Sequence, residues 1–225
     1  MNILAFDTST DILTVELSTA AGRFYDVRDC GLRHSELLAE AIGRLHEAAA
    51  ITPAELDLIA CGRGPGSFTG LRIGMATAKG LAAGLGKPFV TVPTLDLFAY
   101  GFEWFRGTVV SVIDAKKRRF YAAFYERGAK LTADLDIPAE EIVTRLSDTE
   151  TVLYTGPHAD AVYRLESGRD DRFLYPLHRR GNPGGLTALA ERIFQNEGPA
   201  GTDASPVYIR QSEAERSTGG PESHA

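Results

Sequence analysis

Short apolar runs separated by turn-forming residues open the chain. Residues 2–6 fit a central strand, residues 12–17 alternate between apolar and polar, and residues 23–27 predict a third strand of the same meander. Residues 34–49 then place apolar side chains three and four positions apart. This spacing predicts an amphipathic helix with Ser35 as its candidate cap.

A single helical turn and a glycine-rich segment follow. The capping-box pattern at 52–55, with proline at the first helical position, predicts one turn before a short apolar strand at 58–61. The strand runs into a loop whose glycines permit positive φ and close backbone approach. Ser67 or Thr69 can cap the helix that continues to about Gly84. The loop residues of greatest interest are Gly64, Pro65, Gly66, Ser67, Thr69 and Arg72.

The helix after this loop contains residues that weaken helices. Each interior glycine costs about 1 kcal/mol relative to alanine. Glycines and other small residues recur at intervals of three or four, so one face has almost no side-chain bulk. The residues of this face are Gly70, Gly74, Thr77 and Ala78. Such a face suits either close packing on the protein's own sheet or docking of a second chain, and the sequence leaves both open.

The rest of the chain repeats this pattern more loosely. A strand at 88–92 and a helix from Thr94 to about 105 precede a boundary at Gly107. The elements expected beyond it are a hairpin at 109–113 and 120–125, a strand near 130, a helix at 138–146, a strand at 152–155, a helix from 159, a strand at 173 and a helix at 186–196. We expect an α/β protein with domains at 1–106 and 107–210. The tail 211–225 has no large apolar residue and is predicted to be disordered.

Composition and charge narrow the function classes. The 225 residues, 44% of them apolar, suffice for one or two domains with substantial cores. The net charge of −6 disfavours autonomous binding to a nucleic-acid backbone. Cys30 and Cys61 lie far apart with no CxxC motif, which indicates no zinc site and fits a reducing cytoplasm. No leader pattern and no apolar run near 20 residues occurs, so we expect a soluble protein without membrane contact.

Four segments carry a resemblance to a known family. They are GRGPGSFTGLRIG at 62–74, MNILAFDTST at 1–10, IDAKKRRFYAAFY at 113–125 and SPVYIR at 205–210. In this order they resemble the TsaB (YeaZ) family over roughly residues 1 to 210. That family is the non-catalytic partner in the bacterial machinery that makes threonylcarbamoyladenosine (t6A) on tRNA. The resemblance implies two sheet-and-helix halves of the actin, sugar kinase and Hsp70 ATPase (ASKHA) fold.

In ATP-binding members of that fold, a glycine-bearing turn after the first strand of each half holds phosphates, and an aspartate positions the metal. The first turn here offers Asp7, Thr8 and Ser9 as nucleotide-proximal candidates but has no glycine, and the second turn, 114–119, also lacks one. The resemblance thus implies that this chain alone binds no cofactor. ATP and magnesium would belong to the assembled complex.

Residues typical of catalysis are also missing from the sequence. The catalytic subunit of the same machinery holds its metal partly through two histidines four apart on a helix, and the matching segment, 94–100, contains no histidine. No Walker A, HExxH or GxSxG motif occurs either. We therefore expect no catalytic and no metal-binding residue. The alternatives are a stand-alone ATP-binding phosphotransferase or ATPase of this fold, and a peptidase-like metal hydrolase.

The resemblance implies a scaffold that docks through the helix 34–49 and the glycine-rich helix. Its partner would be the homologous catalytic threonylcarbamoyltransferase subunit, or a second copy of the chain in its absence. An ATPase subunit would join that heterodimer, and tRNA would be reached only through the complex. The interface candidates are His34, Leu37, Leu38, Ala41, Ile42, Leu45, Gly70, Leu71, Gly74, Met75, Thr77 and Ala78. Gly74→Leu is expected to disrupt pairing while leaving most of the fold intact.

Two clusters of cations stand out in an acidic chain. Residues 116–119 form a run of four, and Arg179 with Arg180 forms the second cluster. The run at 116–119 is either a solvated hairpin tip or a contact for tRNA within the assembled complex.

Overall fold

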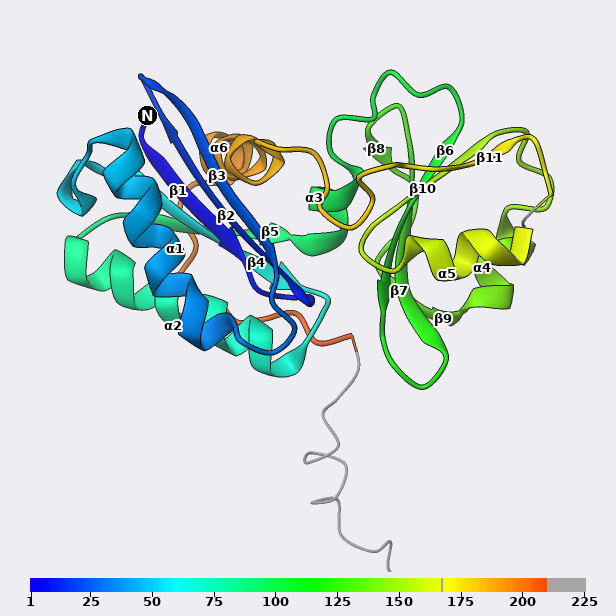
Figure 1. Ribbon diagram of the computed structural model, residues 1–225, viewed down its shortest axis with the longest axis horizontal. Coiled ribbons are helices and arrows are strands. Elements are labelled where there is room, and N and C mark those ends of the chain that lie inside the picture. The colour runs from blue at the N-terminus through cyan, green and yellow to red at the C-terminus, as the bar shows by residue number, and fades with distance from the viewer. Residues whose placement is uncertain (167, 210–225) are drawn as a thin grey trace, which may run out of the picture.

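Two β-sheets, each with helices packed against it, make up the protein (Figure 1). The computed structural model describes residues 1–166 and 168–209. The predicted disordered tail, 211–225, lies outside the described residues. Within the described part, no helix is both long and apolar enough to cross a membrane.

The first sheet has five strands in the order β3-β2-β1-β4-β5. They are β1 (Ile3–Asp7), β2 (Ile12–Thr19), β3 (Gly22–Asp29), β4 (Leu58–Gly64) and β5 (Phe89–Pro93). The first three form the predicted antiparallel meander, and β4 and β5 add in parallel beyond β1. Every residue of β1 is buried because helices cover both faces of this central strand.

The second sheet repeats this connectivity. Its strands are β6 (Thr108–Asp114), β7 (Arg119–Glu126), β8 (Ala129–Lys130), β9 (Leu135–Pro138), β10 (Val152–Thr155) and β11 (Arg172–Leu174). The antiparallel partner β7 lies on one side of β6, and the parallel strands β10 and β11 lie on the other. Two such halves form the ASKHA fold, so the expected α/β class is confirmed.

Helices cover the first sheet on both faces, whereas shorter helices pack on the second sheet. α1 (His34–Ala49) and α2 (Phe68–Leu85) lie on one face of the first sheet, and α6 (Gly185–Glu197) lies on the other (Figure 1). The remaining helices are α3 (Thr94–Ala99), α4 (Ala139–Arg145) and α5 (Ala159–Tyr163), with single 3₁₀ turns at Pro53–Glu55 and Arg164–Glu166.

Several predicted bounds differ from the structure for local reasons. α3 ends at Ala99 and not near 105, because Tyr100 is extended and Gly101 has a φ of 87°. The residue before α1 is Arg33, and no side chain caps that helix, so Ser35 is not its cap. β9, a strand of only four residues, was not predicted from the sequence.

The last helix packs on the first sheet, although the predicted second domain, 107–210, includes it. Leu186, Leu189 and Ala190 share a buried cluster with residues of β1, β4 and β5. Glu16 on β2 is 2% exposed and accepts hydrogen bonds from the backbone N–H groups of Gly184 at 3.0 Å and Thr187 at 2.9 Å. A carboxylate thus satisfies free N–H groups at the start of α6 and holds it on the sheet.

We expect Glu16→Gln to lower the free energy of unfolding by about 1–3 kcal/mol, as measured by urea denaturation. The amide group turns a donor toward N–H groups, so a buried N–H loses its partner. The matched control is Glu40→Gln on α1, where Glu40 pairs with Arg44 at the surface. That change should cost less than about 1 kcal/mol, and equal losses in the two variants would contradict this role for Glu16.

Candidate functional site

The turn after β1 encloses its own aspartate. The Asp7 carboxylate is 2% exposed and accepts hydrogen bonds from Ser9 N at 2.9 Å, Ser9 Oγ at 2.6 Å and Thr94 Oγ1 at 3.2 Å. Burial raises the pKa of Asp7, and the bonds from Ser9 and Thr94 oppose that rise. Asp7 therefore serves to fix the turn, and its oxygens are already engaged inside the protein.

The glycine-rich loop and α2 lie directly against this turn. A Cβ added at Gly62 would overlap the Asp7 carboxylate, one at Gly66 would overlap Ser9, and one at Gly70 would overlap the carbonyl oxygen of Thr8. The contacts are also hydrogen-bonded, with Ser67 N donating to Ser9 O at 2.6 Å and Thr8 Oγ1 donating to Gly70 O at 2.7 Å. Glycine is required at Gly66 and Gly70 because another backbone approaches closely, and at Gly62 because the Asp7 side chain does.

This packing decides the role of two of the small residues that the sequence places on one side of α2, Gly70 and Gly74. A Cβ at Gly74 would lie 2.5 Å from Thr8 Oγ1, which itself is bonded to Gly70. Gly70 and Gly74 therefore pack on the chain's own turn, the first of the two interpretations that the sequence allowed. This contact argues against the expectation that Gly74→Leu leaves most of the fold intact, and the predicted loss of pairing stays a prediction.

The loop is fixed at its other end by the cap of α2 and by the C-terminal segment. Ser67, one of the two predicted caps, accepts a hydrogen bond from Gly70 N at 3.3 Å, whereas Thr69 is exposed on the first turn. Gly64 adopts a φ of 101°, and Pro65 is buried. Arg72 lies over the Phe68 ring at 3.8 Å and donates to Tyr208 Oη at 3.2 Å.

The candidate interface residues divide between interior and surface. The buried ones are His34, Leu38, Ala41, Leu45, Gly70, Leu71, Gly74, Met75 and Ala78. Leu37, Ile42 and Thr77 are partly exposed at the edges of α1 and α2. The buried set stabilises the helices on the first sheet. A docking role for these residues stays a prediction, and the surface available to a partner is made by their neighbours.

The outward face of α1 and α2 carries small residues that were not among the predicted interface residues. This small-residue face, as we name it here, consists of Ala39 and Gly43 on α1 and Ala76, Gly80, Ala83 and Gly84 on α2. All six residues are exposed. A Cβ added at Gly43, Gly80 or Gly84 would meet nothing within 4 Å. Both helices therefore have exposed positions with little side-chain bulk, which on α1 lie among charged residues such as Glu40 and Arg44.

A cleft of about 440 Å³ lies between the two halves, where the turn after β1 meets the β6–β7 turn. Its lining includes Thr10 and Asp11 from the first half, Thr69 from α2, and Asp114 and His158 from the second half. This volume falls in the range of small-molecule sites. Residues of the turn after β1 and of the turn after β6, the two positions where ATP-binding relatives of this fold are expected to hold phosphates, both line the cleft.

Charged groups bridge the halves beside this cleft. Arg179 Nη2 lies 2.8 Å from Asp11 Oδ2 and 2.8 Å from Asp29 Oδ2. Asp114 N donates to His158 Nδ1 at 3.0 Å, so the ring is held as an acceptor at that nitrogen. Burial lowers the pKa of His158, while Asp11 and Asp114 oppose the shift. Arg179 therefore acts within this chain as a link between halves.

The turns fit a magnesium nucleotide poorly. The Asp7 oxygens accept bonds from Ser9 and Thr94, and Lys116 Nζ pairs with Asp114 Oδ2 at 3.0 Å. In residues 1–166 and 168–209, no three His, Cys, Asp or Glu side chains are placed to hold a metal ion. Burial raises the pKa of the Cys61 thiol to about 12, which removes it as a nucleophile at neutral pH. That the isolated chain binds no nucleotide stays a prediction.

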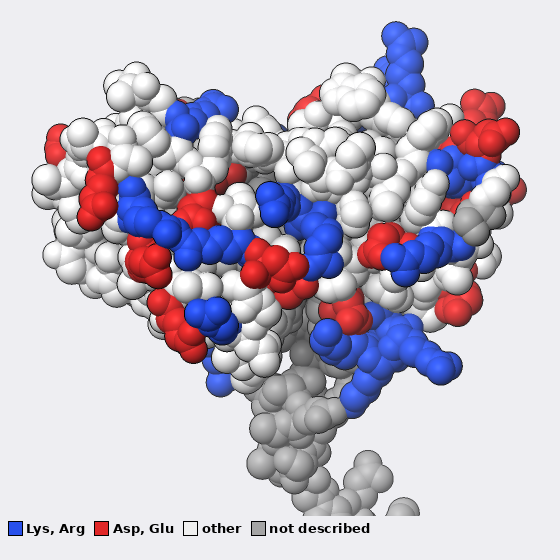
Figure 2. All heavy atoms as spheres, in the orientation of Figure 1, with Lys and Arg blue, Asp and Glu red and all other residues white. Residues whose placement is uncertain are grey.

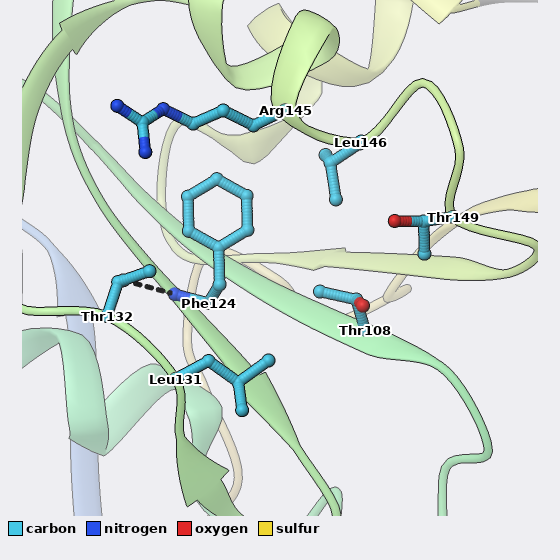
Figure 3. Close-up of a pocket in the computed structure, with 7 residues that line it drawn as sticks. All are labelled: Thr108, Phe124, Leu131, Thr132, Arg145, Leu146 and Thr149. Atoms are coloured by element: carbon cyan, nitrogen blue, oxygen red, sulfur yellow. Dashed lines mark hydrogen bonds between the residues drawn. The ribbon is translucent and has the colours of Figure 1, made fainter.

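A second cavity, of about 320 Å³, lies in the second half, away from both turns (Figure 3). Phe124, Leu131 and Leu146 are its apolar lining residues, and Arg145 is drawn above the Phe124 ring in the view of Figure 3. Arg145 is tied to Glu141 at 2.7 Å. None of the candidate residues from the sequence analysis lies here.

The family model described as TsaD, tRNA N6-adenosine threonylcarbamoyltransferase, matches residues 28–196. An Escherichia coli K12 protein named tRNA threonylcarbamoyladenosine biosynthesis protein TsaB is 31% identical over 236 residues, which cover 99% of this chain and 100% of the relative. The Bacillus subtilis 168 protein of the same name is 32% identical over 129 residues, or 56% of each chain.

Two solved structures from Pseudomonas aeruginosa are also similar. One, YeaZ, is 25% identical with a TM-score of 0.76 and covers 92% of this chain and 100% of its own. The other, an uncharacterized protein described as similar to peptidase YeaZ, is 25% identical with a TM-score of 0.78, covering 93% and 99%.

The fold and the cleft define a two-half, actin-like protein in which the turn after the first strand is closed by the protein's own glycine loop. Similarity to the E. coli relative over the full length identifies the family. The chain belongs to the TsaB (YeaZ) family, as its four motifs indicated.

A matched pair of substitutions tests the packing of the glycines. We expect Gly70→Ala to lower the free energy of unfolding by about 1–3 kcal/mol, since its Cβ overlaps the Thr8 carbonyl oxygen. Gly80→Ala, on the open face, should instead raise it by about 0.5–1 kcal/mol because alanine favours helix. Thermal and urea unfolding of both variants measure this, and changes of the same sign would refute the assignment.

A second pair tests the enclosure of Asp7. The Thr94 hydroxyl donates to Asp7 and accepts from Gly64 N at 3.2 Å. Thr94→Val has a similar shape but leaves both buried partners unsatisfied, so the free energy of unfolding should fall by about 1–3 kcal/mol. Thr94→Ser keeps the hydroxyl and should lose clearly less. If serine is no better than valine at this position, the hydrogen bonds are not what stabilises the turn.

Proposed function

We propose that this chain is a non-catalytic scaffold subunit of the machinery that makes t6A on tRNA. It pairs with the homologous catalytic threonylcarbamoyltransferase subunit. The family supports the pathway, because its E. coli and B. subtilis members are named for t6A biosynthesis. The observation that carries the non-catalytic role is the Asp7 carboxylate, which is enclosed by Ser9, Thr94 and the glycine loop.

The small-residue face is the surface we assign to docking. Ala76 and Gly80 lie four residues apart on α2, and Gly43 gives α1 a similarly flat position. A partner helix can approach such a face closely, which increases the packing contact per residue. Leu37 and Ile42 flank this face with partly exposed apolar surface, and apolar surface of this kind suits the centre of an interface.

The wider assembly follows from the same proposal. A second copy of the chain occupies the face when the catalytic subunit is absent, which gives a homodimer. An ATPase subunit joins the heterodimer, ATP and magnesium act in the assembled complex, and tRNA is reached through it. Both cysteines are free, in keeping with the cytoplasmic location expected from the sequence.

A stand-alone ATP-binding phosphotransferase or ATPase is the alternative, and the cleft of about 440 Å³ between the halves favours it. Calorimetry of the isolated chain with ATP and magnesium separates the two functions. The scaffold proposal expects no heat of binding and no ATP turnover. Turnover by the purified chain would overturn it.

We expect Ala76→Glu to abolish co-elution with the catalytic subunit while leaving the melting temperature of the isolated chain within about 2 °C. Ala76 is exposed on α2, so the carboxylate is solvated in the free chain but must be desolvated in the interface. The control is Gln195→Glu. Gln195 is exposed on α6, on the opposite face of the first sheet, so the variant adds the same charge there and should not affect pairing.

Reconstitution connects docking with function. tRNA modification by the catalytic and ATPase subunits should require this chain and should fail with Ala76→Glu. Undiminished modification without the chain, or undiminished co-elution of Ala76→Glu, would overturn the proposal.

A further inference from the structure

The β6–β7 turn has an unusual backbone. Lys116, Lys117 and Arg118 have φ angles of 62°, 55° and 60°, so three consecutive residues with side chains adopt the left-handed conformation. All three are exposed. With Arg119, the first residue of β7, they form what we call the basic tip, residues 116–119.

The basic tip is held in one shape by hydrogen bonds. Asp114 Oδ1 accepts from Lys116 N at 2.7 Å, Ala115 N donates to Arg119 O at 2.9 Å, and Arg119 N donates to Lys116 O at 3.1 Å. Arg119 Nε also pairs with Asp136 Oδ1 at 2.8 Å. The exposed side chains are therefore presented from a fixed turn.

The residue types at this turn are not those that the backbone favours. Left-handed φ angles are easiest for glycine and tolerable for asparagine or aspartate, whereas long side chains adopt them at a cost. Glycine at 116, 117 and 118 would build the same turn with less strain. Cations in these positions therefore point to a use for their side chains, since strain that persists in a fold often marks a functional segment.

The charge of the basic tip contrasts with that of the rest of the molecule. Four of the 24 Lys and Arg residues stand in consecutive positions of a chain with net charge −6. Figure 2 shows these cations gathered below the second half, at the end of the hairpin that projects downward in Figure 1. Residues 116–119 include no apolar side chain that could anchor a protein interface.

We propose that the basic tip contacts the phosphate backbone of RNA. Lys116 and Arg119 also pair with Asp114 and Asp136. The basic tip as a whole still has an excess of positive charge on a fixed turn, which suits a run of phosphates that Lys and Arg bind without regard to base sequence. This inference rests on the proposed function, because the RNA is the tRNA that the assembly modifies. It gives this chain a part of the tRNA contact in addition to its scaffold role.

The position of the basic tip fits an RNA that reaches a partner subunit. Lys116 lines the cleft together with Phe68 and Thr69 at the start of α2. The outward face of the same helix carries the docking surface proposed above. RNA held at the basic tip therefore lies beside the helix on which the catalytic subunit docks.

The test uses glycine substitutions, which suit the left-handed backbone while removing charge. Arg118→Gly and the double variant Lys117→Gly/Arg118→Gly are compared with the wild type in the heterodimer with the catalytic subunit. The probe is an unmodified tRNA transcript, and its affinity is measured between 50 and 200 mM salt. We expect weaker binding and a salt slope that is shallower by about 1 for the single variant and about 2 for the double variant. The melting temperature should hold or rise.

Arg127→Gly is the matched control. Arg127 is also an exposed cation with positive φ, 48°, but it lies at the opposite end of β7. Arg127→Gly should leave both the tRNA affinity and its salt dependence unchanged. An equal loss with Arg127→Gly would show a diffuse charge effect and overturn the proposal.

The outcomes also separate this inference from the proposed function. Co-elution of the glycine variants with the catalytic subunit should be normal, because the basic tip lies off the docking face. If the glycine variants form the heterodimer normally but the salt dependence of their tRNA affinity is unchanged, only the RNA contact proposed for the basic tip is overturned. Failure of the wild-type chain to form the heterodimer overturns the proposed function. Displacement of the tRNA by an equal concentration of polyglutamate would assign the basic tip to acidic polypeptides and overturn the RNA contact.

Discussion

The contact between the β1–β2 turn and the glycine loop determines how the first half is packed around Asp7 and α2. Gly62, Gly66 and Gly70 have no Cβ where Asp7, Ser9 and the Thr8 carbonyl approach. Because the two backbones touch, the Asp7 carboxylate is shut in and α2 is held on the sheet. The family resemblance places a phosphate at this turn in ATP-binding members, and here the Asp7 oxygens are already hydrogen-bonded to Ser9 and Thr94. This packing supports the proposal that the isolated chain binds no nucleotide.

The two halves share a strand order but use their equivalent turns differently. The turn after β1 faces inward and its polar groups bond to one another. The turn after β6 faces outward, with Lys116, Lys117 and Arg118 in solvent. Arg179 connects the halves through Asp11 and Asp29, which keeps both turns beside one cleft. The equivalent turns of the two halves thus differ, because the turn after β1 forms an internal contact and the turn after β6 forms a charged surface.

Much of this fold was predictable from local pattern, and the remainder depends on distant partners. The bounds of α1 at 34 and 49 follow from an apolar stripe of regular spacing. β9 was missed because a strand of four residues that ends at Pro138 has too little periodicity to be recognised. The position of α6 could not be predicted, since its partners Ile3 and Ala5 lie more than 180 residues earlier in the chain.

The candidate site, too, was predictable only where local sequence determines it. Composition and spacing gave α2 a face of small residues, yet periodicity does not state how a helix is rotated on its sheet. The structure turns Gly70 and Gly74 inward and Gly80 and Gly84 outward. Likewise, four adjacent cations were visible in the sequence, whereas their left-handed backbone was not, because Lys and Arg carry no preference for it.

The packing of α6 on β1 has a consequence for biosynthesis. β1 is covered on one face by α6, which comes much later in the chain, so that face remains uncovered until α6 has been synthesised. All strands of the second sheet, by contrast, lie between residues 108 and 174 and need no later segment to complete their pairing. During synthesis the strands of the second sheet can therefore pair before α6 is available, and apolar surface of the first sheet stays exposed in that interval, in which a chaperone would be of use.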